Sequence, residues 1–467
     1  MSASPVSFGM PKSPAERNRK RKPAPRLAAP QPRPALARVA LVAAGVGLGA
    51  TTALTITAET TSQLSAPGGL FTFLGSLTGM VGTYLALIMV LLVSRIPFVE
   101  RVAGQDGLLR LHRAVAPWPI SLLAAHALFL TLGYAAAART GIWHEAGTLL
   151  ARYPDVPIAA IALGIMCAIG IISVRAIRMR LPRETWWMIH LWMYLALALA
   201  FPHEIVLGPS FVGHPLAQVL WSVIWAATAG LVLVYRIGLP VLRSLRHRLT
   251  VAEVRPEGPG VVSVILTGRN LDRLPVSGGQ FLLWRFLTPG RWWQAHPFSL
   301  SALPQPPYLR LTIKGVGGFS ESLARLRPGT KVAVEGPYGA FTRHAQRRPR
   351  ALLVAGGIGV TALRSLLEDL PRGSAPVVLL RASQPEDLVL SAEIRELVRL
   401  RRGTIHELVG SREEAAIDEV SLPRLVRDLQ QRDVYVCGPE GFVAAIVAVA
   451  QNLGVPDDAI HHEAFAL

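Results

Sequence analysis

Four of the twelve histidines lie in long apolar stretches of the sequence, where a titratable side chain is costly and is by default a functional hypothesis. His112 and His126 share one stretch, and His190 and His203 share a later one. Two imidazoles that face each other across a helical bundle hold a b-type haem with both axial positions of the iron filled. The four side chains therefore predict two haem sites, with packing or hydrogen-bonding histidines as the alternative.

The spacing within each stretch tests whether its two histidines share a helix face. His112 and His126 are fourteen positions apart, which on an ideal helix gives about 21 Å of rise and about 40° of angular difference. His190 and His203 are thirteen positions apart, which leaves them about 140° out of phase. Pro202 lacks a backbone donor, so we expect a kink or local rewinding that brings His203 round to the same side.

The two histidine-bearing stretches are expected to run in the same direction, because one helix separates them. His112 then pairs with His190 near the cytosolic side, and His126 pairs with His203 near the outer side. Since both axial positions would be filled, we expect the outer haem to give electrons up from its edge. A few polar residues near the outer surface are candidates for recruiting a metal, although solvated loop residues are the simpler interpretation: His144, Glu145, Glu204 and His214.

Six stretches are long enough to position these histidines in a membrane, since spanning the hydrocarbon core takes about 20 mostly apolar residues. Arginines gather between the second and third stretches, between the fourth and fifth, and after the sixth, whereas the alternate segments hold two or none. The positive-inside rule therefore predicts a multi-pass protein of the cell membrane with both termini in the cytosol. The predicted spans are 37–57, 70–94, 112–137, 156–177, 186–207 and 215–240.

Composition agrees with a membrane protein of several domains. The chain has 467 residues, and 51% of them are hydrophobic, which is too apolar for a purely soluble protein. Residues 1–38 carry nine lysines and arginines against one acid, in a Pro- and Ala-rich context without an apolar period. We interpret residues 1–36 as a disordered basic cytosolic tail. A tether to nucleic acid or anionic lipid is the alternative for the tail, but no nucleic-acid partner is expected.

After about residue 248 the sequence changes character, with short apolar runs separated by Gly/Pro turns. The runs VVSVILTG, QFLLWRF and YLRLTIK predict a small antiparallel β-barrel. From residue 350 on, strands such as ALLVAGG and DVYVCG alternate with helical stretches, which is typical of a parallel α/β sheet. The predicted architecture is a six-helix transmembrane bundle over 37–247, a barrel over 248–345 and a nucleotide-binding α/β domain over 346–467.

Two motifs in the predicted barrel could hold a flavin. The segment RWWQAHPFSLS ends a strand, so it can lay a ring along a flavin and offer a hydroxyl to its polar edge. Further on, KGVGGFSESL sets a Gly pair before a helical run, whose free backbone N–H groups could bind a pyrophosphate. For Gly317 and Gly318 a simple turn is the alternative. The residues concerned are His296, Pro297, Phe298, Ser299, Gly318, Phe319 and Ser320.

Two further motifs lie in the predicted α/β domain. ALLVAGGIGVTALRSLL reads as strand, Gly-rich turn and helix, although Ala362 departs from the GxGxxG pattern of dinucleotide sites. VYVCGPEGF ends a later strand, where Cys437 taken alone is a small buried hydrophobe. The residues concerned are Gly356, Gly357, Gly359 and Thr361 in the first motif, and Cys437, Gly438, Pro439 and Glu440 in the second.

Taken in order, these features resemble the ferric reductase and NADPH oxidase superfamily. Its members join a six-helix bis-haem domain to a module like ferredoxin-NADP reductase. The resemblance covers about residues 40–467 and rests on an ordered set: the two histidine pairs, HPFS, GGFS, VEGPYG, GGIGVT, CGPEG and an aromatic residue near the C terminus, Phe465.

The resemblance implies a role for each motif. His296–Ser299 and Gly318–Ser320 would hold FAD, and Phe465 would cover the isoalloxazine until nicotinamide displaces it. Here Phe465 is followed by two more residues, whereas an aromatic often closes the chain in relatives. Gly356–Thr361 and Cys437–Glu440 would form the nicotinamide nucleotide site, with Cys437 near the position of hydride transfer.

A second set of residues lies where relatives hold the adenosine part of the nucleotide. Arg381 follows PVVLL, and Ser411 and Arg412 are adjacent. A 2′-phosphate needs cationic and hydroxyl-bearing partners of this kind, so NADPH is predicted, with NADH as the alternative.

The expected activity is a transmembrane oxidoreductase. Electrons would pass from cytosolic NADPH through FAD and two haem b groups to an acceptor on the outer face. FAD is the converter between two-electron and one-electron chemistry. The sequence favours neither dioxygen, which would make an NADPH oxidase, nor ferric chelates, which would make a ferric reductase. A membrane-anchored flavin reductase without haem is the alternative.

Overall fold

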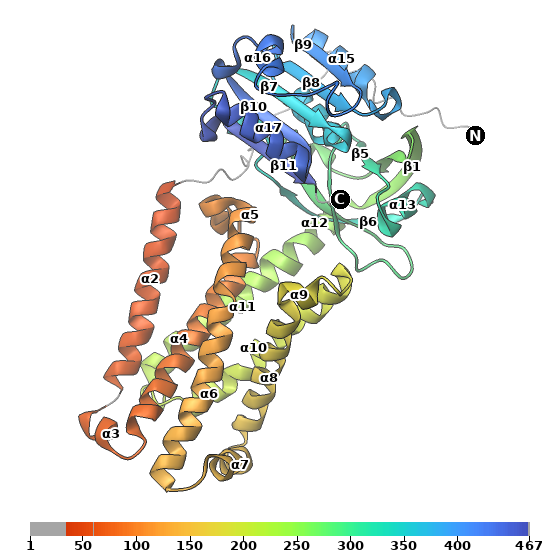
Figure 1. Ribbon diagram of the computed structural model, residues 1–467. Helices are drawn as coiled ribbons and strands as arrows, with labels where there is room; N and C mark the ends of the chain where they lie inside the picture. Colours follow the sequence, from red (N-terminus) through yellow and green to blue (C-terminus); the bar gives the residue numbers. More distant parts are fainter. Residues whose placement is uncertain (1–33, 59, 466–467) are drawn as a thin grey trace. The chain divides into compact units, whose positions relative to one another are not determined.

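A computed structural model describes residues 34–58 and 60–465 of the chain (Figure 1). The chain divides into two compact units, which are described separately. The helical unit is Pro32–Gly238, and the sheet unit is Leu239–Leu467. Most of the predicted basic tail, residues 1–33, lies outside the described residues.

The helical unit contains helices only. Among the described residues, six helical stretches are long and apolar enough to cross a membrane. These stretches are Arg38–Thr57, Gly69–Val93, Gly107–Ala138, Asp155–Ser173, Glu184–Leu207 and Pro215–His247, so the six predicted spans are confirmed as long apolar helices. The elements are α2 (Pro34–Thr57), α3 (Thr61–Ser65), α4 (Gly69–Val93), α5 (Pro97–Val115), α6 (Pro117–Ala138), α7 (Ile142–Arg152), α8 (Asp155–Ser173), α9 (Arg175–Arg178), α10 (Arg183–Leu207), α11 (Pro215–Val232) and a π-helical turn, Leu233–Gly238.

Two prolines shape the helices that carry the histidines. The predicted third span is built from α5 and α6, because Pro117 starts a new helix after Ala116. Ala116 keeps helical angles, φ −51° and ψ −35°, so the break is slight. In α10, Pro202 lies inside the helix, which continues to Leu207.

Glycines bring α4 close to α6. A Cβ atom built at Gly75 would lie 2.7 Å from the Leu130 side chain, and one at Gly82 would lie 3.1 Å from Leu123. Small residues at such positions let helices approach until their backbones nearly touch, which is how membrane helices associate without a hydrophobic driving force between them. The close contact brings Leu123 and Leu130 of α6 directly against the glycines of α4.

The sheet unit begins with α12 (Leu239–His247) and an antiparallel sheet of order β4-β3-β6-β1-β2-β5, the green and teal part of Figure 1. Its core is apolar and includes the fully buried Trp284, Leu309 and Leu311. A closed barrel is not confirmed, because the edge strands β4 and β5 share no ladder. Among the described residues, only the isolated bridge between Leu300, directly after β4, and Leu311 in the middle of β5 links them. The strands are β1 (Leu249–Gly258), β2 (Val261–Thr267), β3 (Phe281–Phe286), β4 (His296–Ser299), β5 (Tyr308–Lys314) and β6 (Lys331–Tyr338), with α13 (Gly318–Ser322) after β5.

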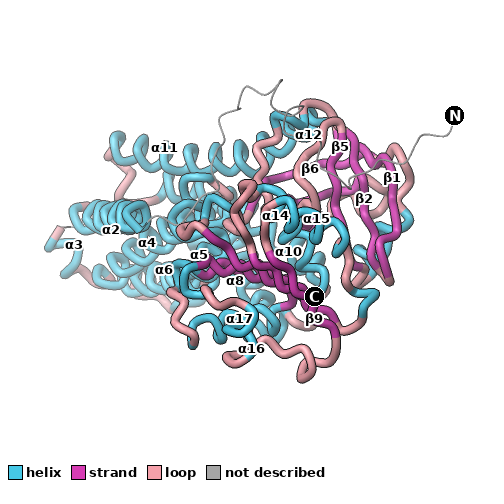
Figure 2. Tube along the Cα trace, turned by 90° about the horizontal axis from the view of Figure 1, so that it is seen from above, coloured by secondary structure: helices cyan, strands magenta, loops and turns pink. Residues whose placement is uncertain are grey.

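The second sheet is parallel, in the order β11-β10-β7-β8-β9, as the alternation of strands and helices predicts. Its strands are magenta in Figure 2, where the edge strand β9 is labelled. Its central strands are buried on both faces, as expected for a parallel sheet. The elements are β7 (Arg350–Gly356), α14 (Val360–Asp369), β8 (Val377–Ala382), α15 (Ser391–Leu400), β9 (Thr404–Val409), α16 (Ser421–Leu425), β10 (Arg432–Pro439), α17 (Glu440–Asn452) and β11 (Ile460–Phe465).

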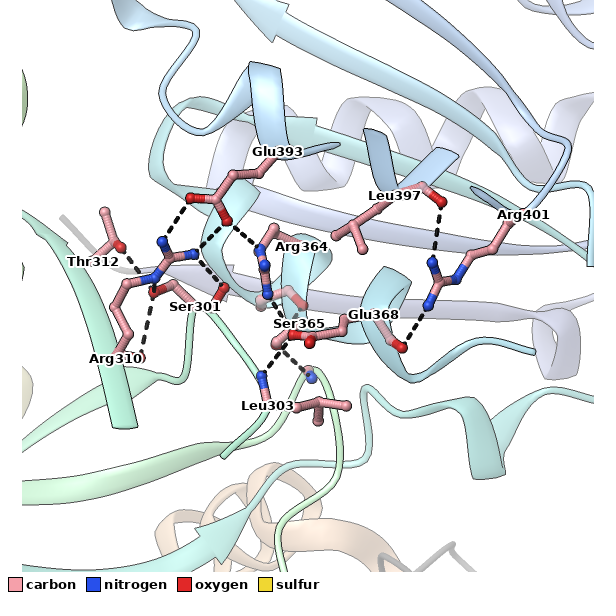
Figure 3. Close-up of polar contacts among 12 residues, drawn as sticks. Ser301, Leu303, Arg310, Thr312, Arg364, Ser365, Glu368, Glu393, Leu397 and Arg401 are labelled. Carbon is pink, nitrogen blue, oxygen red and sulfur yellow. Dashed lines mark hydrogen bonds and ion pairs between the residues drawn. The ribbon is translucent and has the colours of Figure 1, made fainter. Parts of the chain in front are cut away.

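An ionic network joins the two sheets within the sheet unit (Figure 3). Arg310 of β5 donates two hydrogen bonds, of 2.7 and 2.8 Å, to the carboxylate of Glu393 on α15. Arg364 of α14 donates to the same carboxylate at 2.8 Å and also pairs with Glu368. Glu368 in turn accepts from the backbone N–H of Leu303 at 2.9 Å. The network fixes the parallel sheet against the antiparallel one.

Candidate cofactor sites

The first histidine pair joins the last turn of α5 to the second turn of α10. The ring centroids of His112 and His190 are 6.3 Å apart with an interplanar angle of 71°. His112 Nδ1 lies 3.2 Å from the carbonyl oxygen of Met89 on α4. The ring of Trp186 stacks on His190 at 4.9 Å, and the guanidinium of Arg178 lies over the Trp186 ring at 4.5 Å.

The second pair joins the middle of α6 to the end of α10. The ring centroids of His126 and His203 are 6.2 Å apart with an interplanar angle of 72°. His126 Nδ1 lies 2.8 Å from the carbonyl oxygen of Gly75. Gly79 leaves the space for the ring, because a Cβ atom there would lie 2.5 Å from His126 Nδ1. The predicted pairing of the four histidines is therefore present as a geometric arrangement.

These contacts determine which ring nitrogen of His112 and His126 is available for a metal. A carbonyl oxygen only accepts hydrogen bonds, so Nδ1 must donate and, in the neutral ring, Nε2 keeps its lone pair. Metal-bound histidines usually donate their other ring nitrogen in this way. On α10, the Nδ1 atoms of His190 and His203 are buried without a partner.

Two of the four polar candidates, Glu145 and Glu204, are not the solvated loop residues that their sequence context favoured. Glu145 is on α7 and only 8% exposed. The Glu204 carboxylate accepts hydrogen bonds from Thr83 and from two tryptophans. His144 and His214 are exposed. Within residues 34–58 and 60–465 no three His, Cys, Asp or Glu side chains come together to hold a metal ion.

In the antiparallel sheet, HPFS forms β4 itself and pairs with β3. The indole of Trp284 donates to the carbonyl oxygen of Phe298 at 2.9 Å and so anchors the strand. The ring of His296 stacks on Phe319 at 3.6 Å and 19°, which brings the two sequence motifs together. The hydroxyl of Ser299 is buried and has no hydrogen-bond partner, while Pro297 is exposed.

The GGFS motif forms the turn into the short helix α13. A Cβ atom at Gly317 or Gly318 would meet nothing within 4 Å, so the turn borders open space. The Ser320 hydroxyl is engaged locally, since it accepts from the N–H of Val316 at 2.9 Å and donates to the carbonyl of Gly317 at 3.1 Å. Ser320 therefore shapes the turn.

In the parallel sheet the two glycine motifs pack against each other where β7 and β10 end. A Cβ atom at Gly359 would lie 2.2 Å from the Cys437 carbonyl oxygen, and one at Gly438 would lie 3.0 Å from the Gly356 carbonyl oxygen. Gly357 is different, because it has a positive φ of 54°, is exposed and has open space beside it. The Thr361 hydroxyl donates to the carbonyl oxygen of Ile358 at 3.0 Å and so closes the first turn of α14.

Cys437 and Phe465 lie on neighbouring strands. In the parallel ladder of β10 and β11, Cys437 is opposite Glu463, and Pro439 is opposite Phe465. Cys437 is fully buried, and burial raises the pKa of its thiol well above the usual range, with a further contribution from Glu463. The group is therefore a neutral thiol at physiological pH. Glu440 is exposed and opens α17.

The predicted adenosine-binding residues meet at the carboxyl ends of β8 and β9. Arg381 donates to the carbonyl oxygens of Gly410 and Ser411 at 2.9 and 2.6 Å. The N–H of Ser411 donates to Glu414 at 2.8 Å, and its hydroxyl accepts from the N–H of Glu414. These bonds, first through the backbone and then through the side chain of Ser411, lower the pKa of Glu414. Arg412 is exposed beside them.

The residues that sequence reasoning missed are those that support the histidines. Trp186 stacks on His190, the carbonyl oxygens of Met89 and Gly75 accept from ring nitrogens, and Gly79 makes room for His126. The glycine spacing of α4 was the available signal for a close helix contact. The spacing alone does not indicate which side chain of the neighbouring helix fills the space beside each glycine.

The comparisons with known proteins follow the same division. The family model "Ferric reductase like transmembrane component" matches residues 78–201, which include His112, His126 and His190 and end two residues before His203, and the model "FAD-binding domain" matches residues 247–342. The helices and sheets thus define a multi-pass membrane protein with a reductase module that binds FAD and NAD(P). The chain belongs to the ferric reductase and NADPH oxidase superfamily, as a fusion of a ferric reductase-like transmembrane component with a ferredoxin-NADP reductase-like module.

Individual relatives match part of the chain. It is 30% identical over 187 residues to ferredoxin--NADP reductase B of Sorangium cellulosum, covering 36% of this chain and 77% of that protein. It is 28% identical over 239 residues to a flavohemoprotein of Chromobacterium violaceum, covering 46% and 59%. The chain spans between 51% and 59% of the length of the flavohemoproteins that it matches first. The solved FAD/NAD-binding domain of a nitric oxide dioxygenase from Vibrio cholerae is 23% identical, with a TM-score of 0.41, covering 47% and 98%.

Proposed function

We propose that this protein is a transmembrane oxidoreductase that passes electrons from cytosolic NADPH, by way of FAD and two b-type haems, to an acceptor on the outer face. The acceptor is dioxygen or a ferric chelate. When bound, the flavin supplies conversion between hydride and single-electron transfer, and the haems supply one-electron carriers within the bilayer. The observation that carries the proposal is the presence of two histidine pairs with nearly the same ring separation, 6.3 and 6.2 Å.

The histidines fit the haem. An imidazole nitrogen binds a divalent metal at about 2.0–2.1 Å, and the ring centre lies about 1.1 Å further out, so two axial rings on one metal have centres about 6.3 Å apart. Both observed separations agree with this value. The hydrogen bonds from Nδ1 of His112 and His126 leave Nε2 for the metal. Each pair would therefore hold one haem, and α10 would supply one histidine to each, His190 to the first and His203 to the second.

The antiparallel sheet fits the flavin. Ser299 offers a buried hydroxyl without a protein partner, which suits a polar atom of the isoalloxazine. The stacked rings of His296 and Phe319 form a flat aromatic wall beside it. The turn at Gly317 and Gly318 borders open space, where backbone N–H groups can approach a pyrophosphate. These residues would bind and orient FAD.

The parallel sheet fits the nicotinamide nucleotide. Gly357 opens the turn after β7, where ligands of parallel α/β sheets bind. Phe465 lies opposite Pro439 and beside the strand of Cys437, so it would cover the flavin face that nicotinamide must reach. Arg381 holds the Ser411 turn, and Arg412 is free to face a 2′-phosphate, which favours NADPH over NADH.

We assign the parts of the chain accordingly. Residues 37–247 would be the bis-haem transmembrane domain, residues 248–345 the FAD domain and residues 346–467 the nucleotide domain. By the positive-inside rule the arginine-rich segments favour both termini in the cytosol, so electrons would move outward across the membrane.

The test is a reduced-minus-oxidised spectrum of the purified full chain, together with NADPH consumption when dioxygen or ferric citrate is offered separately. We expect b-type bands with two haems per chain. Absence of these bands would leave only a membrane-anchored flavin reductase. Superoxide dismutase distinguishes the acceptors: if it abolishes reduction under air while ferric citrate is untouched without oxygen, the ferric-reductase outcome fails.

A further inference from the structure

The carboxylate of Glu204 sits directly after His203 and joins three membrane helices. Its Oε1 accepts a hydrogen bond from the Thr83 hydroxyl on α4 at 2.9 Å. Its Oε2 accepts from the indole N–H groups of Trp221 at 2.9 Å and Trp225 at 3.2 Å, both on α11. Thr83 is 4% exposed and Trp221 is 3% exposed, so the bonds lie inside the bundle. We call these four residues the carboxylate clamp.

The carboxylate clamp lies next to a proline that interrupts the backbone hydrogen bonding of α10. Pro202 has no N–H to donate, so the hydrogen-bond ladder of α10 is interrupted one residue before His203. On an ideal helix, His190 and His203 would also be about 140° out of phase. An external restraint on the segment after Pro202 is therefore needed to direct His203 toward His126.

The neighbouring residues direct the two side chains apart. His203 meets His126 of α6, whereas Glu204, the next residue, meets α4 and α11. Consecutive helical residues point about 100° apart, so fixing Glu204 also fixes the rotation of His203. The two tryptophans of the carboxylate clamp are themselves packed against aromatic rings, since Phe201 packs on Trp225 and Phe211 packs on Trp221.

We propose that Glu204 is a positioning residue for the second haem, because its clamp sets the rotation of α10 that holds His203 in axial position. The inference rests on the proposed function. The positioning role depends on the hydrogen bonds that the Glu204 carboxylate accepts, so we expect glutamine at this position to be an adequate substitute. The carboxamide oxygen can accept from both indoles, and its NH2 can donate to the Thr83 hydroxyl.

The experiment compares Glu204→Gln and Glu204→Leu in the full-length protein. We expect Glu204→Gln to keep both haems, and Glu204→Leu, which removes every acceptor, to weaken binding of the second haem by about 10–100-fold, as is usual for groups that orient a metal ligand. The readouts are haem per chain, the low-spin electron paramagnetic resonance signal of each haem and its midpoint potential. The spectrum of His126→Leu identifies the signal of the second haem.

The matched control is Glu145→Leu on α7. Glu145 is also a largely buried carboxylate that accepts from a threonine hydroxyl, that of Thr140 at 3.2 Å, but it touches neither pair. We expect this variant to keep both haem signals. The signal of the first haem, which the same helical unit would hold, reports whether that unit of each variant is folded. NADPH-driven reduction of a soluble dye reports the same for the sheet unit.

The outcomes separate the two proposals. If the unaltered protein holds no b-type haem, the proposed function fails. If it holds two and Glu204→Leu keeps the second signal unchanged, the positioning role fails. Loss of the second signal in Glu204→Gln as well would overturn the role of hydrogen bonding and point to the charge instead. Trp221→Phe keeps an aromatic side chain and removes one donor, so we expect a shifted second signal with the first unchanged.

Discussion

His112 and His190 meet close to helix ends, whereas His126 and His203 meet in the middle of α6 and after a proline in α10. Both pairs reach nearly the same ring separation. In the first pair a side chain, Trp186, stacks on the α10 histidine. In each pair a backbone carbonyl accepts from the other histidine, and the second pair adds the space left by Gly79 and the carboxylate clamp.

The difference shows that a disturbed helix needs more external support than a regular one. Near the start of α10 the helix ladder fixes His190, and a stacked ring is sufficient to hold its plane. Beyond Pro202 the ladder is interrupted, and hydrogen bonds from α4 and α11 hold the chain. The second pair should therefore respond more strongly to small changes in helix packing.

Removing one ligand from each pair tests the comparison most directly. We expect His126→Leu and His112→Leu each to lose about half of the bound haem, because one axial ligand of one iron is gone in each variant. Electron transfer across the membrane should be abolished in both. NADPH-to-FAD reduction should stay intact, measured by flavin bleaching under anaerobic conditions. Loss of both haems in either variant would contradict the independence of the two pairs.

The next largest effect is expected at Gly79. An Ala Cβ there would lie 2.5 Å from His126 Nδ1, so the ring must move and its hydrogen bond to Gly75 must weaken. We expect Gly79→Ala to reduce retention of the second haem by about tenfold. Gly164→Ala is the control, because a Cβ on that residue of α8 meets nothing within 4 Å. Haem titration of both variants measures the difference, and equal affinities would contradict the close-contact argument.

A smaller effect is expected at Trp186. Trp186→Leu removes the ring that stacks on His190 but leaves both ligands of the first pair, so we expect a shifted signal of the first haem and no change in the second. Trp192→Leu, at an exposed position of the same helix, should change neither. Electron paramagnetic resonance of the oxidised protein distinguishes the two haems. A change in the second signal alone would reverse the comparison.

The smallest effect on the histidine pairs is expected from a change to the ion pairs that join the two sheets of the sheet unit. Burial would raise the pKa of Glu393, but the hydrogen bonds and charges of Arg310 and Arg364 outweigh it and lower that pKa. Its contribution to stability is therefore present above pH 4.5, the ordinary value, and is lost as the pH falls through the lowered pKa. Glu393→Gln should unfold more easily than the unaltered protein at pH 7, and the gap should narrow below pH 4.5.

Thermal unfolding of the full chain followed by tryptophan fluorescence at pH 7 and pH 4 measures that gap. Glu396→Gln is the control, because its partner Arg399 lies at the surface of the same helix, where an ion pair contributes little. Both haem signals should be unchanged at pH 7. A gap that widens in acid would have the wrong sign for a lowered pKa.

Much of the architecture follows from local pattern. Hydropathy defines the six long helices, and runs of apolar residues define β2, β3, β5, β7, β8 and β10. The strands β1, β6, β9 and β11 were not predicted. β6 contains Gly336 and Pro337, and β11 is largely polar, so neither has the apolar run that marks a buried strand.

The sequence by itself determined the spans, the four membrane histidines, their division between two parallel helices and the order of the nucleotide motifs, because each depends on residue type and spacing along one segment. The tertiary structure decided the ring separations, the space that Gly79 leaves for His126 and the clamp on Glu204. Thr83 and Glu204 are 121 positions apart, so no local period records their contact. Only the packing of whole helices brings such groups together.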